Sequence, residues 1–69
     1  MDTGWTVIHL ARSEQNAWEI LRFLRQESFL ARYRRVTARS GQSDCFEILV
    51  PGGEAPEAQQ LLIDNNLLR

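Results

Sequence analysis

The segment that decides the fold is SEQNAWEILRFLRQESF, residues 13–29. It begins with Ser13, whose hydroxyl can accept a hydrogen bond from a free N–H group of a first helical turn, and Glu14 suits the positive end of a helix dipole. Apolar side chains then recur at the spacing of one helix face, at Ala17, Ile20, Leu21 and Leu24. The segment therefore predicts an amphipathic helix that begins at Ser13 and lies with one face on a core.

The segments on both sides of this helix have the composition of β-strands. Residues 5–10 (WTVIHL) are rich in β-branched and aromatic side chains and are too short for a helix. Residues 29–39 (FLARYRRVTAR) and residues 45–50 (CFEILV) alternate between two kinds of side chain, and a turn-forming loop near residues 39–43 joins them as a hairpin. Pro51 ends the third strand, because proline lacks the N–H donor that a strand ladder needs.

A second helix is predicted after the third strand. Pro56 suits its first turn, and Glu54 and Glu57 suit its positive end. Helical spacing is shown by Ala55, Ala58, Leu61 and Leu62. The helix should end near residues 64–66, where two asparagines favour a left-handed exit. Residues 67–69 are then left as a frayed tail or a short fourth strand.

The predicted order is β-α-β-β-α, in one domain that spans residues 1–69 with an ordered core of about residues 5–65. A right-handed crossover, with the third strand inserted between the first two, gives an antiparallel sheet in the order 1-3-2 with both helices on one face. This is an α+β, ferredoxin-like sandwich that lacks most of its last strand. The predicted core side of the sheet comprises Thr6, Ile8, Leu10, Phe29, Ala31, Tyr33, Phe46, Ile48 and Val50.

Three segments carry a resemblance to a known family: HLARSEQNAWEIL (residues 9–21), LRQESFLARYR (residues 24–34) and FEILVPGGEAPEAQQLL (residues 46–62). With these segments the chain resembles a family of short prokaryotic domains described as signal-transducing proteins. The resemblance covers nearly the whole chain, and it implies the β-α-β-β-α fold without supplying an established activity. The chain departs from the family at Ser28, because many similar chains have glycine at this helix exit.

The residues for several kinds of chemistry are missing from the sequence. Some short chains similar to this one are labelled glutamate decarboxylase, but a lysine must hold the pyridoxal phosphate of that enzyme. All 8 Lys+Arg residues of this chain are arginine. His9 and Cys45 are each the single residue of their kind, too few for a metal site built from histidine and cysteine. We therefore expect no enzymatic activity, no cofactor and no metal site.

Charge and composition set further limits on function. The net charge of −1 and the pI near 5.7 argue against general binding of nucleic acid or anionic membranes. No apolar run approaches the roughly 20 residues needed to cross a bilayer. A lone cysteine, and the lack of a signal-peptide pattern before Trp5, predict a cytoplasmic protein.

The side of the predicted sheet that no helix covers supplies the first functional hypothesis, a non-enzymatic regulatory or protein-interaction module. Its side chains would form a patch more apolar than monomers usually expose. The predicted interaction face comprises Trp5, Val7, His9, Leu30, Arg32, Arg34, Cys45, Glu47 and Leu49. The partner would be another protein or a second copy of the chain, in a weak homodimer.

The densest cluster of charge supports an alternative, a sensor that binds an anionic metabolite or nucleotide. Arginine forks suit carboxylate and phosphate groups. The cluster lies on the predicted second strand and the loop after it, and comprises Arg32, Arg34, Arg35 and Arg39. Charged side chains of this kind are also typical of an edge strand that avoids pairing with other chains. Both interpretations stay open from the sequence.

Overall fold

The computed structural model describes residues 4–37 and residues 44–67. In chain order its elements are β1 (Trp5–Ala11), α1 (Glu14–Gln26), β2 (Arg32–Val36), β3 (Cys45–Pro51), the short 3-10 helix η1 (Gly52–Glu54) and α2 (Ala55–Asp64). This is the predicted order, and the α+β class is confirmed. The loop predicted near residues 39–43 lies outside the described residues.

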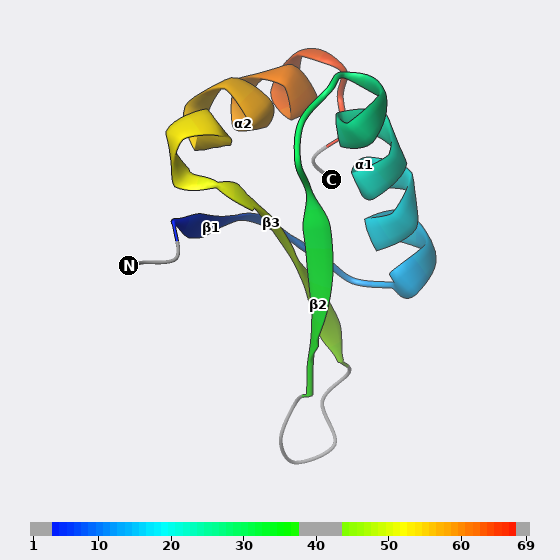
Figure 1. The fold of residues 1–69 in the computed structure, drawn as a ribbon. Coiled ribbons are helices and arrows are strands. Elements are labelled where there is room, and N and C mark those ends of the chain that lie inside the picture. The colour runs from blue at the N-terminus through cyan, green and yellow to red at the C-terminus, as the bar shows by residue number, and fades with distance from the viewer. Residues whose placement is uncertain (1–3, 38–43, 68–69) are drawn as a thin grey trace.

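The sheet has three antiparallel strands in the order β1-β3-β2, which confirms the predicted topology. Figure 1 shows α1 and α2 gathered on one side of the strongly twisted strands. Helix α1 contacts all three strands, whereas α2 contacts β1 and β3. The described elements include no fourth strand, so the likeness to a complete ferredoxin-like sandwich stays a prediction.

Helix α1 begins and packs as the sequence predicts. The Ser13 hydroxyl accepts a hydrogen bond from the backbone N–H of Asn16 at 3.1 Å. All four side chains of the predicted stripe are buried. They share one apolar cluster with the buried side of β3, which comprises Phe46, Ile48 and Val50. The centre of the core therefore lies between α1 and the central strand.

Helix α1 ends through a left-handed residue. Ser28 has a φ of 72°, and its N–H donates to the carbonyl oxygen of Arg25 at 3.0 Å. The N–H of Phe29 donates to the carbonyl oxygen of Leu24, also at 3.0 Å. This pair of hydrogen bonds is the usual glycine-terminated helix cap. A side chain at the left-handed position costs energy, so Ser28 carries local backbone strain.

Helix α2 ends in the same way at Asn66, whose φ of 60° confirms the predicted left-handed exit. The N–H of Leu67 donates to the carbonyl oxygen of Leu62 at 2.9 Å, and the Leu67 side chain packs against the core. Leu67 therefore belongs to a helix cap and not to a fourth strand. Residues 68–69 lie outside the described residues.

Strand β1 contains a bulge that the sequence did not predict. Its pairing with β3 shifts between Val7 and His9, so that Ile8 is the extra residue. Beyond the bulge, Leu10 is 53% exposed and Ala11 is 1% exposed. The prediction that Leu10 lies in the core is wrong, because the extra residue reverses the alternation and gives that place to Ala11.

The first residues of β1 also differ from the prediction. Thr6 lies opposite Val50 in the pairing, as its predicted side requires, but it is exposed.

The main chain of Gly52 passes close to Gly4, so that a Cβ at Gly52 would lie 3.1 Å from the Gly4 carbonyl oxygen. This close approach explains why glycine follows Pro51.

Strand β2 is shorter than predicted but has the predicted orientation. It begins at Arg32. Ala31, the residue that precedes the strand, is buried. Phe29 and Tyr33 are partly buried against the core, and Leu30 is exposed on the other side. The predicted alternation of this segment is therefore confirmed.

The helix phase predicts a large difference between two alanine substitutions. Leu24→Ala removes a fully buried side chain and should lower the free energy of unfolding by about 2–5 kcal/mol. Glu19→Ala, on the exposed side of α1, should change it by less than about 0.5 kcal/mol. Urea titration measures both free energies of unfolding. Equal changes in the two variants would contradict the assignment of Leu24 to the buried face of α1 and of Glu19 to its exposed face.

The strained helix exit predicts a stabilising substitution. Ser28→Gly should raise the free energy of unfolding by on the order of 0.5–1 kcal/mol, because relief at the left-handed position exceeds the entropy cost of glycine. The matched control is Glu27→Gly, at a φ of −90°, which gains no relief and should destabilise. Thermal and urea unfolding of both variants test the prediction, and a loss of stability in Ser28→Gly would contradict it.

Candidate functional site

The candidate site is the side of the sheet turned away from the helices, which we call the open face. The pairing of the strands arranges its side chains in rows. One row comprises Val7, Leu49 and Arg32, and the next comprises Leu10, Glu47 and Arg34. The β1 side of the open face is therefore apolar, and the β2 side is basic.

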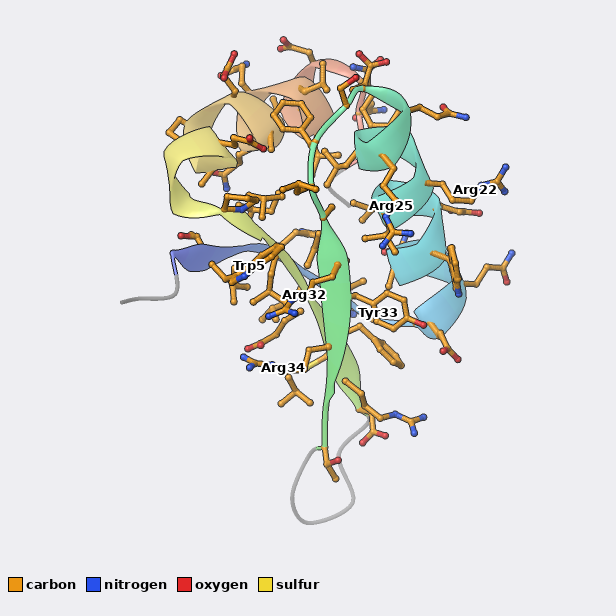
Figure 2. The ribbon with its side chains drawn as sticks, viewed as in Figure 1. Trp5, Arg22, Arg25, Arg32, Tyr33 and Arg34 are labelled. Atoms are coloured by element: carbon orange, nitrogen blue, oxygen red, sulfur yellow. The ribbon has the colours of Figure 1, made fainter. Side chains whose placement is uncertain are left out.

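A stacked pair of side chains crosses the open face. The Arg32 guanidinium carbon lies 4.3 Å from the centre of the Trp5 ring, and Figure 2 shows the two side chains meeting. Trp5 is on β1 and Arg32 on β2, so the pair spans the central strand. Leu49, on β3 between them, is only 6% exposed. Leu49 thus lies on the predicted face, but little of its surface is exposed.

Two arginines of the predicted cluster are paired with acidic residues. Arg34 forms an ion pair with Glu47, directly opposite on β3, and its Nε donates to Glu47 Oε1 at 2.9 Å. Arg35 Nε lies 3.3 Å from Asp44 Oδ2. These arginines are largely exposed, so the pairs contribute little stability. They do reduce the positive charge available to a ligand.

The structure does not bring the four predicted arginines together. Arg35 lies opposite Phe46, and its guanidinium stands 5.6 Å from that ring, so it belongs to the side of the sheet that faces the helices. Arg32 and Arg34 share the open face. Arg39 lies outside the described residues. An anion could therefore meet at most two of the three described arginines on one face.

Arg32 differs from its neighbours in its electrostatic surroundings. Within residues 4–37 and 44–67, no carboxylate lies within ion-pairing distance of its guanidinium. A hollow of about 320 Å³ adjoins it, lined by Arg32, Tyr33, Arg34 and Leu49. The open face thus has an arginine without an acidic partner at the edge of a recess.

Exposed apolar side chains lie on β1, across the sheet from this arginine, and just before β2. Val7 is 41% exposed, Leu10 is 53% exposed, and Leu30, just before β2, is 65% exposed. Leu10 was not predicted for this face, because only the bulge places it there. No pattern in the sequence marks the bulge.

Two further predicted residues of the open face are less available than expected. The bulge places His9 opposite Ile48, on the pairing position of a core residue, and His9 is half-buried. Its Nε2 is buried, with no hydrogen-bond partner among the described residues, and burial lowers the pKa of His9. Cys45 lies at the start of β3 opposite Val36 and is also half-buried.

Both outer edges of the sheet have features that discourage the addition of a strand. Strand β2 exposes Arg32, Arg34 and Arg35, and charged edges resist pairing. Strand β1 has no such charges, but its bulge interrupts the regular edge. The Gln59 side chain of α2 also donates to the carbonyl oxygen of Ile8, at 3.4 Å. The open face is therefore a better candidate for binding than either edge.

Tyr33 has a role that sequence analysis missed. Its hydroxyl donates a hydrogen bond to Glu14 Oε2 at 2.8 Å, which ties β2 to the first turn of α1. Its ring makes edge contacts with Trp18, at 6.2 Å between centroids, and with Phe46, at 5.8 Å. The hydrogen bond to Glu14, with some burial, raises the pKa of Tyr33.

Another hollow, of about 280 Å³, lies where α1 ends beside α2, and its lining comprises Glu27, Phe29, Glu57, Gln60, Leu61 and Asp64. Its acidic rim includes no histidine or cysteine.

Across the part of the chain that the structure describes, no three histidine, cysteine or acidic side chains gather as metal ligands would. None of the helices found there has the length and apolar character needed to cross a membrane.

Comparisons with protein-family models, with curated proteins and with solved structures gave no significant match. The resemblance to short signal-transducing domains therefore stays a prediction. The open face, with its stacked pair and its apolar surroundings, is the feature on which a functional argument rests.

The Tyr33 contact predicts a measurable titration. Ionisation would break the hydrogen bond to Glu14 and place two negative charges side by side, so the folded pKa lies above the unfolded one. The contact therefore stabilises the fold below the unfolded pKa, and this contribution is lost as the pH rises through the folded pKa. Glu14→Gln should lower the tyrosine pKa, whereas Glu19→Gln should leave it unchanged.

The chain has a single tyrosine, so ultraviolet absorbance of tyrosinate against pH reports Tyr33 alone. The same pKa in the wild type and in Glu14→Gln would show that the hydrogen bond is absent in solution.

Proposed function

We propose that this chain is a non-enzymatic regulatory or protein-interaction module that binds another protein, or a second copy of itself, through the open face. The observation that carries the proposal is the set of exposed apolar side chains around the stacked pair, Val7, Leu10 and Leu30. Apolar clusters of this kind on small domains are typical of interaction sites. The proposal includes a cytoplasmic setting, on the basis of the lone Cys45.

The chemistry of the open face supports protein binding in a second way. Tryptophan and arginine are among the residue types most often found at the energetic centre of protein interfaces, and Trp5 and Arg32 lie in contact on this face. Apolar side chains lie on both flanks of the pair, on β1 and just before β2. Aromatic residues and arginine are enriched in interfaces, and this face carries both together with exposed apolar side chains.

One observation favours the sensor of an anionic metabolite or nucleotide as a second candidate. The hollow beside Arg32 and Arg34 is large enough for a small anion. Against it, Arg34 already has Glu47 as its partner, and Arg35 is turned to the other side of the sheet. A sensor should lose its ligand steeply with added salt, because its binding would depend on exposed charges. Binding through apolar contacts should persist.

The proposal predicts that polar substitutions on the open face abolish association without loss of stability. Leu10→Ser and Leu30→Ser change exposed side chains, so each should shift the free energy of unfolding by less than about 0.5 kcal/mol. The matched control is Ile63→Ser on α2, which is as exposed as Leu10 at 53%. Leu49→Ser is unsuitable because Leu49 is buried.

Sedimentation velocity over a wide concentration range, and affinity capture with each variant as bait, measure association. The wild type and Ile63→Ser should behave alike, and both open-face variants should lose the association. A wild type that stays monomeric and captures nothing would contradict the proposal, as would association that all three variants retain.

A further inference from the structure

We propose that the partner of the open face is a different protein, and that it presents an aspartate or glutamate side chain to Arg32 with apolar side chains on both sides of that acid. This inference rests on the proposed function and specifies the chemistry of its partner. It follows from the contact of Arg32 with Trp5, from the lack of a carboxylate near Arg32 among the described residues, and from the balance of charge on the open face.

The Arg32 side chain already has a contact partner within the domain. Long exposed side chains normally lose freedom when they bind, which weakens association. The Arg32 guanidinium instead lies against the Trp5 ring at 4.3 Å, in the free domain. A guanidinium stacked on a ring uses its flat face for the contact and keeps its N–H groups, which lie in the plane, for an acceptor. The contact with Trp5 thus leaves the N–H groups of Arg32 able to meet a carboxylate in the bidentate manner.

The charges of the open face show what the partner must supply. Its two rows contain two arginines, Arg32 and Arg34, and one acid, Glu47, which leaves one positive charge. Glu47 is engaged by Arg34, while Arg32 has no carboxylate at ion-pairing distance within the described ranges. Burying Arg32 under a partner without an acid would leave a charge uncompensated, which is costly. A carboxylate from the partner removes that cost.

The same balance argues against a second copy as the occupant. Two open faces brought together would combine four arginines with two glutamates, both of which already have partners. Each Arg32 would then meet a surface that is itself basic, and like charges oppose such an arrangement. The complementary surface therefore belongs to another protein with an excess of negative charge at the contact.

The recess beside Arg32 matches an acidic side chain better than a phosphate. Its volume of about 320 Å³ holds one aspartate or glutamate side chain and leaves room for its main chain, and Leu49 supplies an apolar wall. A phosphate would carry more charge into a site whose other described arginine, Arg34, is already paired with Glu47. Leu10 and Leu30, on opposite sides of the stacked pair, require apolar side chains on both sides of the acid.

The experiment selects ligands without assuming their sequence. A random twelve-residue peptide library is displayed on phage and selected on the wild-type domain, and the enriched peptides are synthesised. We expect them to carry aspartate or glutamate between apolar residues. Arg32→Gln should weaken their binding about tenfold or more, which corresponds to about 1.4 kcal/mol. The matched control is Arg22→Gln, an exposed arginine on α1 that Figure 2 shows away from the open face, and it should change binding less than about twofold.

A double-mutant cycle then tests the contact itself. The acid of the selected peptide is changed to its amide, and both peptides are measured on the wild type and on Arg32→Gln. If the acid meets Arg32, the amide peptide should bind the wild type about tenfold more weakly and should lose little more on Arg32→Gln. Circular dichroism and urea titration check that Arg32→Gln is folded. Arg32→Lys, which keeps the charge without the flat fork, gives a second reading and should restore only part of the binding.

The outcomes separate this inference from the proposed function. Peptides that lose binding on Leu10→Ser but lack an acid, or show no coupling to Arg32, would overturn the inference and leave the interaction module in place. Peptides indifferent to Leu10→Ser and Leu30→Ser, or no enrichment at all, would count against both. Displacement of the peptides by inorganic phosphate at low millimolar concentration would overturn the inference in favour of the anion sensor.

Discussion

The central strand β3 imposes the constraint on which the rest of the structure depends, because it carries a large apolar side chain, Leu49, on the side that the helices do not cover. Ile48 and Val50 face α1 and α2 and are fully buried. Leu49 faces the other side and is nevertheless 6% exposed. A chain of 69 residues buries only about 60% of its unfolded surface, and its described elements form no third layer on this side. The side chains of Trp5 and Arg32 act as that layer.

This cover links stability to binding. Burial of a leucine contributes about 1.5–3 kcal/mol, whereas a stacked arginine at an exposed site contributes about 0.5–1 kcal/mol. The burial of Leu49 therefore contributes more free energy than the contact between Arg32 and Trp5 that covers it. A protein that docks over Trp5 and Arg32 would add contacts to the cover without opening it, so binding and folding would favour the same arrangement of these two side chains.

The elements of the fold could be predicted where the sequence permits a single interpretation. Helix α1 has one apolar stripe, and β3 has one side that comprises Phe46, Ile48 and Val50. The prediction that each of these lies in the core is confirmed. The bulge in β1 could not be predicted. Leu10 and Ala11 are both apolar, so either could lie in the core, and no glycine or proline marks the extra residue. The choice depends on how β1 fits β3 and α2.

Sequence analysis predicted which residues lie on the open face. The contacts that each of their side chains makes depend on pairing across strands. Arg34 meets Glu47, and Arg32 meets Trp5, only because the sheet places distant segments opposite each other. Any charged residue on β2 would discourage edge pairing. A lysine would do so without the flat guanidinium that suits an indole ring, so the contact of Arg32 with Trp5 exceeds what edge protection requires.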